Sequence, residues 1–254
     1  GAAGNDVDTD LSSTGLLNIN SDQNIYLIEV AGDLLIDLVM SNYGKAYLAA
    51  QGSILNGTGS GSPSVIAGAA IFRSDAGVGS SSNSLLTQVQ NVEGSVSGGM
   101  WLQNLGALSV GGAGDDPNGA TTAGGGIQIT ASSPVTIVAD VLAADDIIVT
   151  STDKLEGGDD ITIRTNVNVQ STAGRVVLQG GDNVILESGS VIHSLGDVEI
   201  YGDYNDADPV TGSIIELYGT IIANSVKVKG NTNDDLVVIS GNLVSTLIDT
   251  SEGD

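Results

Sequence analysis

The last third of the chain aligns with itself, and this internal repetition constrains the fold more than any other feature. Four short apolar segments, which begin at Asp160, Asn183, Ser213 and Asp235, recur at steps of 23, 30 and 22 residues. A polar insertion at residues 202–209 accounts for the longer step. Two further short segments follow each of the first three at matching offsets. Three short strands in each period of about 22 residues are the sequence pattern of a parallel β-solenoid.

The rest of the chain supports an all-β fold. Apolar and polar residues alternate with a period of two in most segments, and no segment has the length and period of a long helix. Residues 25–36 also resemble residues 100–110 at an offset of about 75, which we interpret as further repetition. In such a coil we expect Ile161, Val184, Ile214 and Leu236 to lie roughly above one another in a single coiled sheet.

The charge balance excludes several classes of partner. The chain has 31 acidic and 7 basic residues and a formal net charge of −24. Nucleic acid binding is disfavoured because it requires clustered Lys and Arg. Membrane insertion is not expected, since no stretch approaches the roughly 20 apolar residues of a span. Two interpretations of the acidity remain open, namely binding of divalent cations by loop carboxylates and solubility in a salty medium.

Four segments carry a resemblance to a known family: Gly52–Asn56, Arg73–Gly79, Gly106–Val110 and Gly181–Ser190. They resemble the repeats of filamentous-haemagglutinin-like adhesins and other giant bacterial surface proteins and exoproteins. The resemblance covers roughly residues 20–240. It implies a right-handed parallel β-helix, export to the cell exterior and a role as a stalk, an adhesin or a matrix fibre. It supplies no catalytic residues.

These observations predict the architecture. We expect a right-handed parallel β-helix of about ten turns of roughly 22 residues, with Gly-, Ser- and Asp-rich corner loops. Residues 1–254 would form a single module on the order of 50 Å long, at about 4.8 Å per turn. The chain contains no Cys and begins with Gly, and we expect it to be either a processed product or an excised segment of a longer repeat protein.

Calcium is the cofactor that the acidic loops favour. Residues 111–116 fit the first six positions of the calcium-binding β-roll repeat, but Asn118 replaces its apolar residue and no tandem copy follows. Isolated sites built from carboxylate oxygens remain, with a solvated acidic loop as the alternative for each. The candidate metal ligands are Asp6, Asp8 and Asp10; Asp203, Asp206 and Asp208; Asp153, Asp159 and Asp160; and Asp234 and Asp235.

Catalysis is not expected. β-Helical polysaccharide lyases and hydrolases need paired carboxylates, or calcium with a basic residue, and the seven basic residues here are scattered. We expect Arg164 and Arg175 to form surface ion pairs with acidic residues of neighbouring turns. Tyr201, Tyr204 and Tyr218, close to the long loop at residues 202–212, are the candidate aromatic patch for a glycan.

The function favoured by the sequence is structural. We expect an extracellular segment, on a bacterial cell surface or secreted, that extends or assembles end to end into a fibre or matrix and is stabilised by calcium. A solenoid exposes strand edges at its ends, so its partners would be neighbouring modules or other copies. The alternatives are an adhesin module that binds a glycan or a cell-surface partner, and a β-helical polysaccharide lyase or hydrolase.

Overall fold

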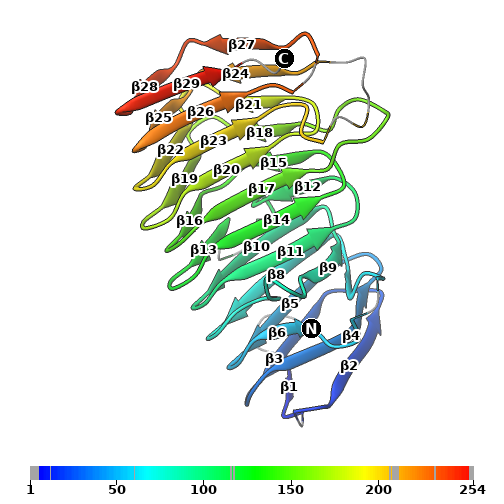
Figure 1. Cartoon of the computed structure of the whole chain (residues 1–254). Coiled ribbons are helices and arrows are strands. Elements are labelled where there is room, and N and C mark those ends of the chain that lie inside the picture. Colours follow the sequence, from blue (N-terminus) through cyan, green and yellow to red (C-terminus); the bar gives the residue numbers. More distant parts are fainter. Residues whose placement is uncertain are drawn as a thin grey trace.

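The computed structural model describes residues 6–11, 13–59, 61–114, 116, 118–205, 207, 212–231 and 233–251. It is a parallel β-solenoid of about eleven turns spaced about 22 residues apart, so the predicted all-β coil is confirmed with one more turn than expected (Figure 1). None of the described residues is helical, and this part of the chain therefore supplies no helix that could cross a membrane.

Two parallel sheets run along the whole coil. The larger, 17-stranded sheet contains β1 (Val7–Thr9), β3 (Ile25–Glu29), β5 (Lys45–Ala50), β8 (Ala69–Ser74), β10 (Asn91–Val96), β12 (Leu108–Val110), β13 (Ala120–Thr122), β15 (Val135–Ile137), β16 (Val141–Ala143), β18 (Ile161–Ile163), β19 (Asn168–Ser171), β21 (Val184–Leu186), β22 (Val191–Ser194), β24 (Ile214–Leu217), β25 (Thr220–Ile222), β27 (Leu236–Ile239) and β28 (Asn242–Val244). The second, 12-stranded sheet contains β2 (Leu16–Ser21), β4 (Leu34–Ser41), β6 (Ile54–Asn56), β7 (Val65–Ile66), β9 (Leu85–Gln88), β11 (Met100–Asn104), β14 (Ile127–Ala131), β17 (Ile147–Ser151), β20 (Val176–Gln179), β23 (Val198–Tyr201), β26 (Ser225–Lys229) and β29 (Leu247–Ser251).

The number of strands per turn changes along the chain. The N-terminal turns give one longer strand to the larger sheet, whereas each turn from β12 onward gives it two short strands. One strand of the second sheet completes each of these turns, as in β18, β19 and β20. The three strands per period that the sequence predicts are thus confirmed in the C-terminal half.

The period of two in the sequence builds the core. In β14 the side chains of Ile127, Ile129 and Ala131 are buried, while those of the alternate residues are partly exposed. Ile127 pairs with Ile147 of the next turn, and this column continues through Val176, Val198 and Val226. Each fully buried aliphatic side chain contributes about 1.5–3 kcal/mol relative to exposure, so such columns hold the turns together.

The four residues predicted to lie above one another are on successive paired strands of one sheet, β18, β21, β24 and β27, but the last two are shifted by one residue. Val184 pairs with Ile215, which in turn pairs with Val237, so these residues continue the column of Ile161. Ile214 and Leu236 face outward and are 44% and 53% exposed. Because side chains alternate between the two faces of a strand, a shift of one residue exchanges inward and outward positions. The insertion before β24 hid this shift in the sequence.

The interpretation of the 75-residue echo as a structural repeat is also wrong. Residues 25–29 form β3 of the larger sheet, whereas residues 100–104 form β11 of the second sheet. The two copies therefore occupy different sides of the coil. They share only an alternating strand, a turn with Gly and a second strand, a pattern that recurs in any chain of this composition.

Candidate functional site

Many of the acidic residues connect neighbouring turns at the corners of the coil. Asp33, Asp146 and Asp160 each directly precede a strand, and each accepts a hydrogen bond from a backbone N–H of the next turn. The three pairs are Ser53 N to Asp33 Oδ1 (2.7 Å), Arg175 N to Asp146 Oδ1 (2.9 Å) and Asn183 N to Asp160 Oδ1 (3.2 Å). Backbone N–H groups at corners leave the strand ladder and need another acceptor. Some of the many acidic residues therefore stabilise the corners of the coil.

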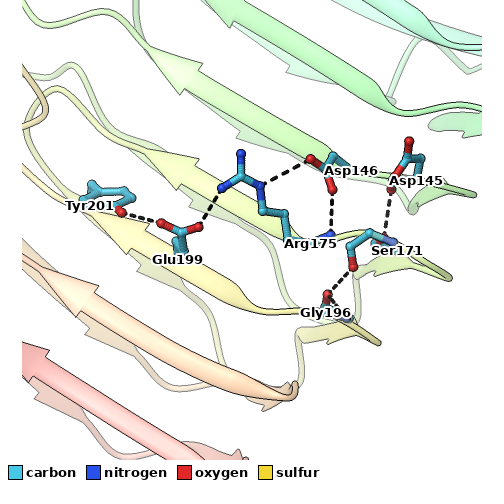
Figure 2. A network of polar contacts seen from close by, with 9 residues as sticks. Asp145, Asp146, Ser171, Arg175, Gly196, Glu199 and Tyr201 are labelled. Atoms are coloured by element: carbon cyan, nitrogen blue, oxygen red, sulfur yellow. Dashed lines mark hydrogen bonds and ion pairs between the residues drawn. The ribbon is translucent and has the colours of Figure 1, made fainter.

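A ladder of charged side chains crosses the outer face of the second sheet (Figure 2). The guanidinium of Arg175 lies 3.3 Å from Asp146 Oδ2 on the preceding turn and 2.8 Å from Glu199 Oε1 on the following turn. The Tyr201 hydroxyl donates to Glu199. Hydrogen bonds to Glu199 and then Asp146 raise the pKa of Arg175, while burial and the bond to Glu199 raise the pKa of Tyr201.

The second predicted ion pair lies on the larger sheet. Arg164 Nη1 is 2.5 Å from Glu187 Oε1 on the next turn, and Thr165 N donates to Glu187 Oε2 at 2.9 Å. The hydrogen bond from Arg164, followed by that from Thr165, lowers the pKa of Glu187. The expectation that Arg164 and Arg175 pair with acids of neighbouring turns is thus confirmed.

Four aspartates from three consecutive turns gather at what we call the acidic corner: Asp153, Asp159, Asp182 and Asp203. Their exposures are 8%, 1%, 6% and 1%, respectively. Asp182 Oδ2 accepts the backbone N–H groups of Gly158 and Asp159, and Asp159 Oδ2 accepts that of Lys154 at 2.7 Å. Backbone donors therefore offset part of the cost of burying these carboxylates.

The acidic corner contains aspartates from two loops that the sequence predicted to be separate metal sites. Ala207 N, in the long loop at residues 202–212, donates to Asp153 of the earlier loop. Asp203 also accepts a hydrogen bond from Asn233 on the following turn at 3.3 Å. Among the predicted ligands, Asp206 and Asp208 lie outside the described residues.

The other predicted ligands are dispersed. Asp8 and Asp10 are exposed on and beside β1, Asp234 is exposed, and Asp235 accepts hydrogen bonds from Ser213 N and Oγ at 2.7 and 2.8 Å. Asp160 accepts its hydrogen bonds from Asn183. Within the described part of the chain, no three acidic or histidine side chains lie close enough together to hold a metal ion.

The predicted aromatic patch is only partly assembled. The rings of Tyr201 and Tyr204 lie 6.1 Å apart and are tilted by 54°. Tyr218 follows β24 of the other sheet, where its hydroxyl donates to Glu216 at 2.8 Å. That hydrogen bond raises the pKa of Tyr218. Tyr218 therefore belongs to a different side of the coil from Tyr201.

Sequence reasoning missed a hollow on the outer face of the N-terminal turns. This outer hollow has a volume of about 390 Å³ and is lined by residues that include Asp6, Tyr26, Tyr47, Ile71, Arg73 and Asp116. The rings of Tyr26 and Tyr47 are stacked, with centroids 4.2 Å apart and planes inclined by 9°. These two tyrosines are 21 residues apart, about one turn, which is the signal that could have predicted the stack.

A loop between β12 and β13 reaches back across the larger sheet and contributes Asp116 to the lining of the outer hollow. This crossing loop comprises residues 111–119, of which 115 and 117 lie outside the described part. Ala113 N donates to Glu93 Oε1 at 2.8 Å, and Ala113 O accepts from Lys45 Nζ at 2.5 Å. Gly111, Gly112, Gly114 and Gly119 adopt positive φ angles that favour glycine. The β-roll-like segment of the sequence therefore contacts β10 through Glu93 and β5 through Lys45.

The C-terminal end of the coil leaves inward-facing positions uncovered. Ile239 continues the column of Leu217, and Ile248 continues that of Val226. Leu217 and Val226 are 0% and 1% exposed, whereas Ile239 and Ile248 are 40% and 47% exposed. At the N-terminal end, Leu17 is 9% exposed, but Val7, which continues the column of buried Leu27, is 53% exposed. The side chain of Glu29, also at that end, accepts hydrogen bonds from Thr9 Oγ1 and Leu11 N at 2.7 and 2.9 Å.

By fold, the chain belongs to the class of parallel β-solenoids. A scan against protein-family models and searches of curated proteins and solved structures found no match. The resemblance to filamentous-haemagglutinin-like repeats therefore stays a prediction.

Proposed function

We propose that this chain is a non-catalytic structural segment that extends end to end through its C-terminal turn. One observation carries the proposal, namely the exposure of inward-facing apolar side chains on β27 and β29. Outward-facing Leu236, Val244 and Leu247 add to the same apolar end, at 53%, 50% and 62% exposure. An uncovered strand edge next to an apolar surface favours pairing with another strand.

A neighbouring module of the same polypeptide or a second copy of this chain can supply the matching edge. β1 and β2 begin the larger and second sheets at the N-terminal end, and β27, β28 and β29 end them at the other. All strand pairs within both sheets are parallel, so head-to-tail stacking would continue each sheet in the same direction. Such a contact joins two different surfaces and does not close, and it therefore generates a filament.

Repulsion between acidic residues opposes this assembly, and the assembly therefore depends on the ions in the surrounding medium. Asp8 lies on β1 and Asp249 on β29, so both ends carry carboxylates, and the formal net charge of each copy is −24. Salt screens such repulsion, and divalent cations neutralise it. We therefore propose that the segment acts outside the cell, where calcium would neutralise the carboxylates at the acidic ends. The affinity range of extracellular calcium modules, about 10⁻⁴–10⁻³ M, suits such sites.

Sedimentation velocity over a series of protein concentrations, at low and high salt, tests the assembly. The wild-type chain is expected to form longer species as concentration and salt rise, with rods visible in electron micrographs. Leu247→Asp should remain monomeric because it adds a charge at the apolar end. Leu155→Asp is the matched control, since Leu155 is 81% exposed on a loop away from this end. A wild-type monomer under all conditions, or assembly of Leu247→Asp, would contradict the proposal.

Thermal unfolding tests the calcium component separately. Added calcium should raise the unfolding temperature, and a chelator should reverse that rise, because a ligand that binds the folded chain stabilises it by mass action. Magnesium is the control ion, since its demand for compact octahedral coordination fits loop carboxylates less well. Equal unfolding temperatures with calcium and with chelator would refute calcium binding and leave the assembly proposal intact.

A further inference from the structure

We propose that the outer hollow binds a neutral oligosaccharide, with a pyranose ring packed against Tyr26 and Tyr47 and its hydroxyl groups bound by Arg73 and Asp116. This site is on the larger sheet at the N-terminal turns. It is separate from the C-terminal end that carries the proposed assembly and from the loop at residues 202–212. Its volume of about 390 Å³ falls within the usual range of ligand pockets, about 300–1,000 Å³.

The floor of the hollow is aromatic and apolar. Tyr26, Tyr47 and Ile71 pair across β3, β5 and β8, so they form one outward-facing column with one residue per turn. Both tyrosines are partly exposed, while Ile71 is only 2% exposed. Tyrosine offers a large rigid apolar surface together with a polar hydroxyl. The faces of a pyranose ring carry C–H groups, which suit such a floor.

The rim of the hollow supplies both donors and acceptors. Arg73 Nη2 donates to the backbone oxygen of Asp116 at 2.7 Å and to its Oδ2 at 2.9 Å. The Arg73 and Asp116 side chains remain 53% and 94% exposed. Both bonds use Nη2, and the described residues supply no partner for Nε or Nη1. Neighbouring hydroxyl groups of a sugar match this arrangement, because each can accept from the guanidinium and donate to the carboxylate.

The charges and the geometry disfavour other occupants. Asp6 and Asp116 lie on the rim, and the formal net charge is −24, so an anionic ligand would be repelled. A peptide that adds a strand needs a free sheet edge. The hollow lies instead on the face of a sheet whose strands already pair on both sides, as β5 does with β3 and β8. A neutral ligand with flat apolar faces and many hydroxyl groups avoids both difficulties.

Isothermal titration calorimetry with a panel of hexasaccharides tests the site. The probes are cellohexaose, maltohexaose, xylohexaose and N-acetylchitohexaose, with hexagalacturonate as the anionic comparison. At least one neutral probe should bind the wild-type chain, and hexagalacturonate should not. Arg73→Gln and Tyr26→Leu should each weaken that binding about tenfold or more, the usual effect of losing a hydrogen bond to a charged group or an aromatic contact.

Two matched variants serve as controls. Arg164→Gln removes another surface arginine from an ion pair, and Tyr43→Leu changes a tyrosine that is 85% exposed outside the hollow. Both should bind like the wild type, as should the monomeric Leu247→Asp variant. If Tyr26→Leu fails to fold, Arg73→Gln decides, since exposed ion pairs contribute little stability. No binding of any neutral probe, equal binding of hexagalacturonate, or unchanged binding by Arg73→Gln would overturn the proposal.

Discussion

Two substitutions in one core column test how far the C-terminal end is open. Ile163, Leu186, Leu217 and Ile239 follow one another on four successive turns. Leu186 is 0% exposed between its two neighbours, whereas Ile239 is 40% exposed at the last turn. Leu186→Ala should therefore cost about 2–5 kcal/mol, because it removes buried methyl groups and leaves an enclosed cavity.

The same truncation at the end of the column should cost much less. Ile239→Ala should lower the free energy of unfolding by about 1 kcal/mol. Folding buries only part of the Ile239 side chain, and its truncation leaves no enclosed cavity. Chemical unfolding followed by circular dichroism on dilute protein measures the first effect. Hydrogen exchange of the β27 amides measures the second, because an end turn of a solenoid can open by itself.

The costs of the two substitutions can also be compared at increasing protein concentration. If copies stack on the C-terminal turn, the cost of Ile239→Ala should increase as the protein is concentrated, while the cost of Leu186→Ala should not change. A cost for Ile239→Ala in dilute protein as large as that for Leu186→Ala would refute the reasoning. It would mean that the end of the column is covered within a single chain.

Two further predictions concern polar contacts. The pKa of Glu187 is lowered by Arg164, so its contribution to stability exists above the ordinary value of 4.5 and disappears as pH falls through the folded pKa. The difference in unfolding temperature between the wild type and Glu187→Gln should thus shrink below about pH 4.5, and a constant difference would contradict this assignment. Asn104 is 1% exposed, and its side chain bonds Thr87, Val89 N and O, and the carbonyl oxygens of Gly106 and Ala107. Asn104→Ala should cost about 2–4 kcal/mol in chemical unfolding because it leaves buried backbone groups unpaired, whereas the same change at exposed Asn42 should cost little.

The sequence predicts the solenoid because its two strongest patterns are local. Alternation with a period of two defines the strands, and the recurrence of about 22 residues defines the turns. The inward position of Ile215 in place of Ile214 is not defined in this way. Both are apolar, the insertion before them has no fixed length, and only packing against Val184 and Val237 selects the register.

The candidate sites are less predictable because they depend on contacts between distant residues. Lys45 and Ala113 are 68 positions apart, and nothing near either residue indicates that the crossing loop reaches the N-terminal turns. The corner aspartates are different. An Asp directly before an apolar strand recurs at Asp33, Asp146 and Asp160. This pattern could have predicted that these aspartates stabilise the corners.

Because each turn contacts mainly the turns before and after it, the length of this molecule can change in whole steps of one turn. Removing residues 161–183 would join Asp160 to Val184 and preserve the aspartate before the strand. Val184 would then take the place of Ile161 opposite Val135. Gain or loss of such a unit alters the reach by about 4.8 Å without changing the cross-section. Duplication and deletion of turns during evolution would therefore change the length of the molecule in regular steps.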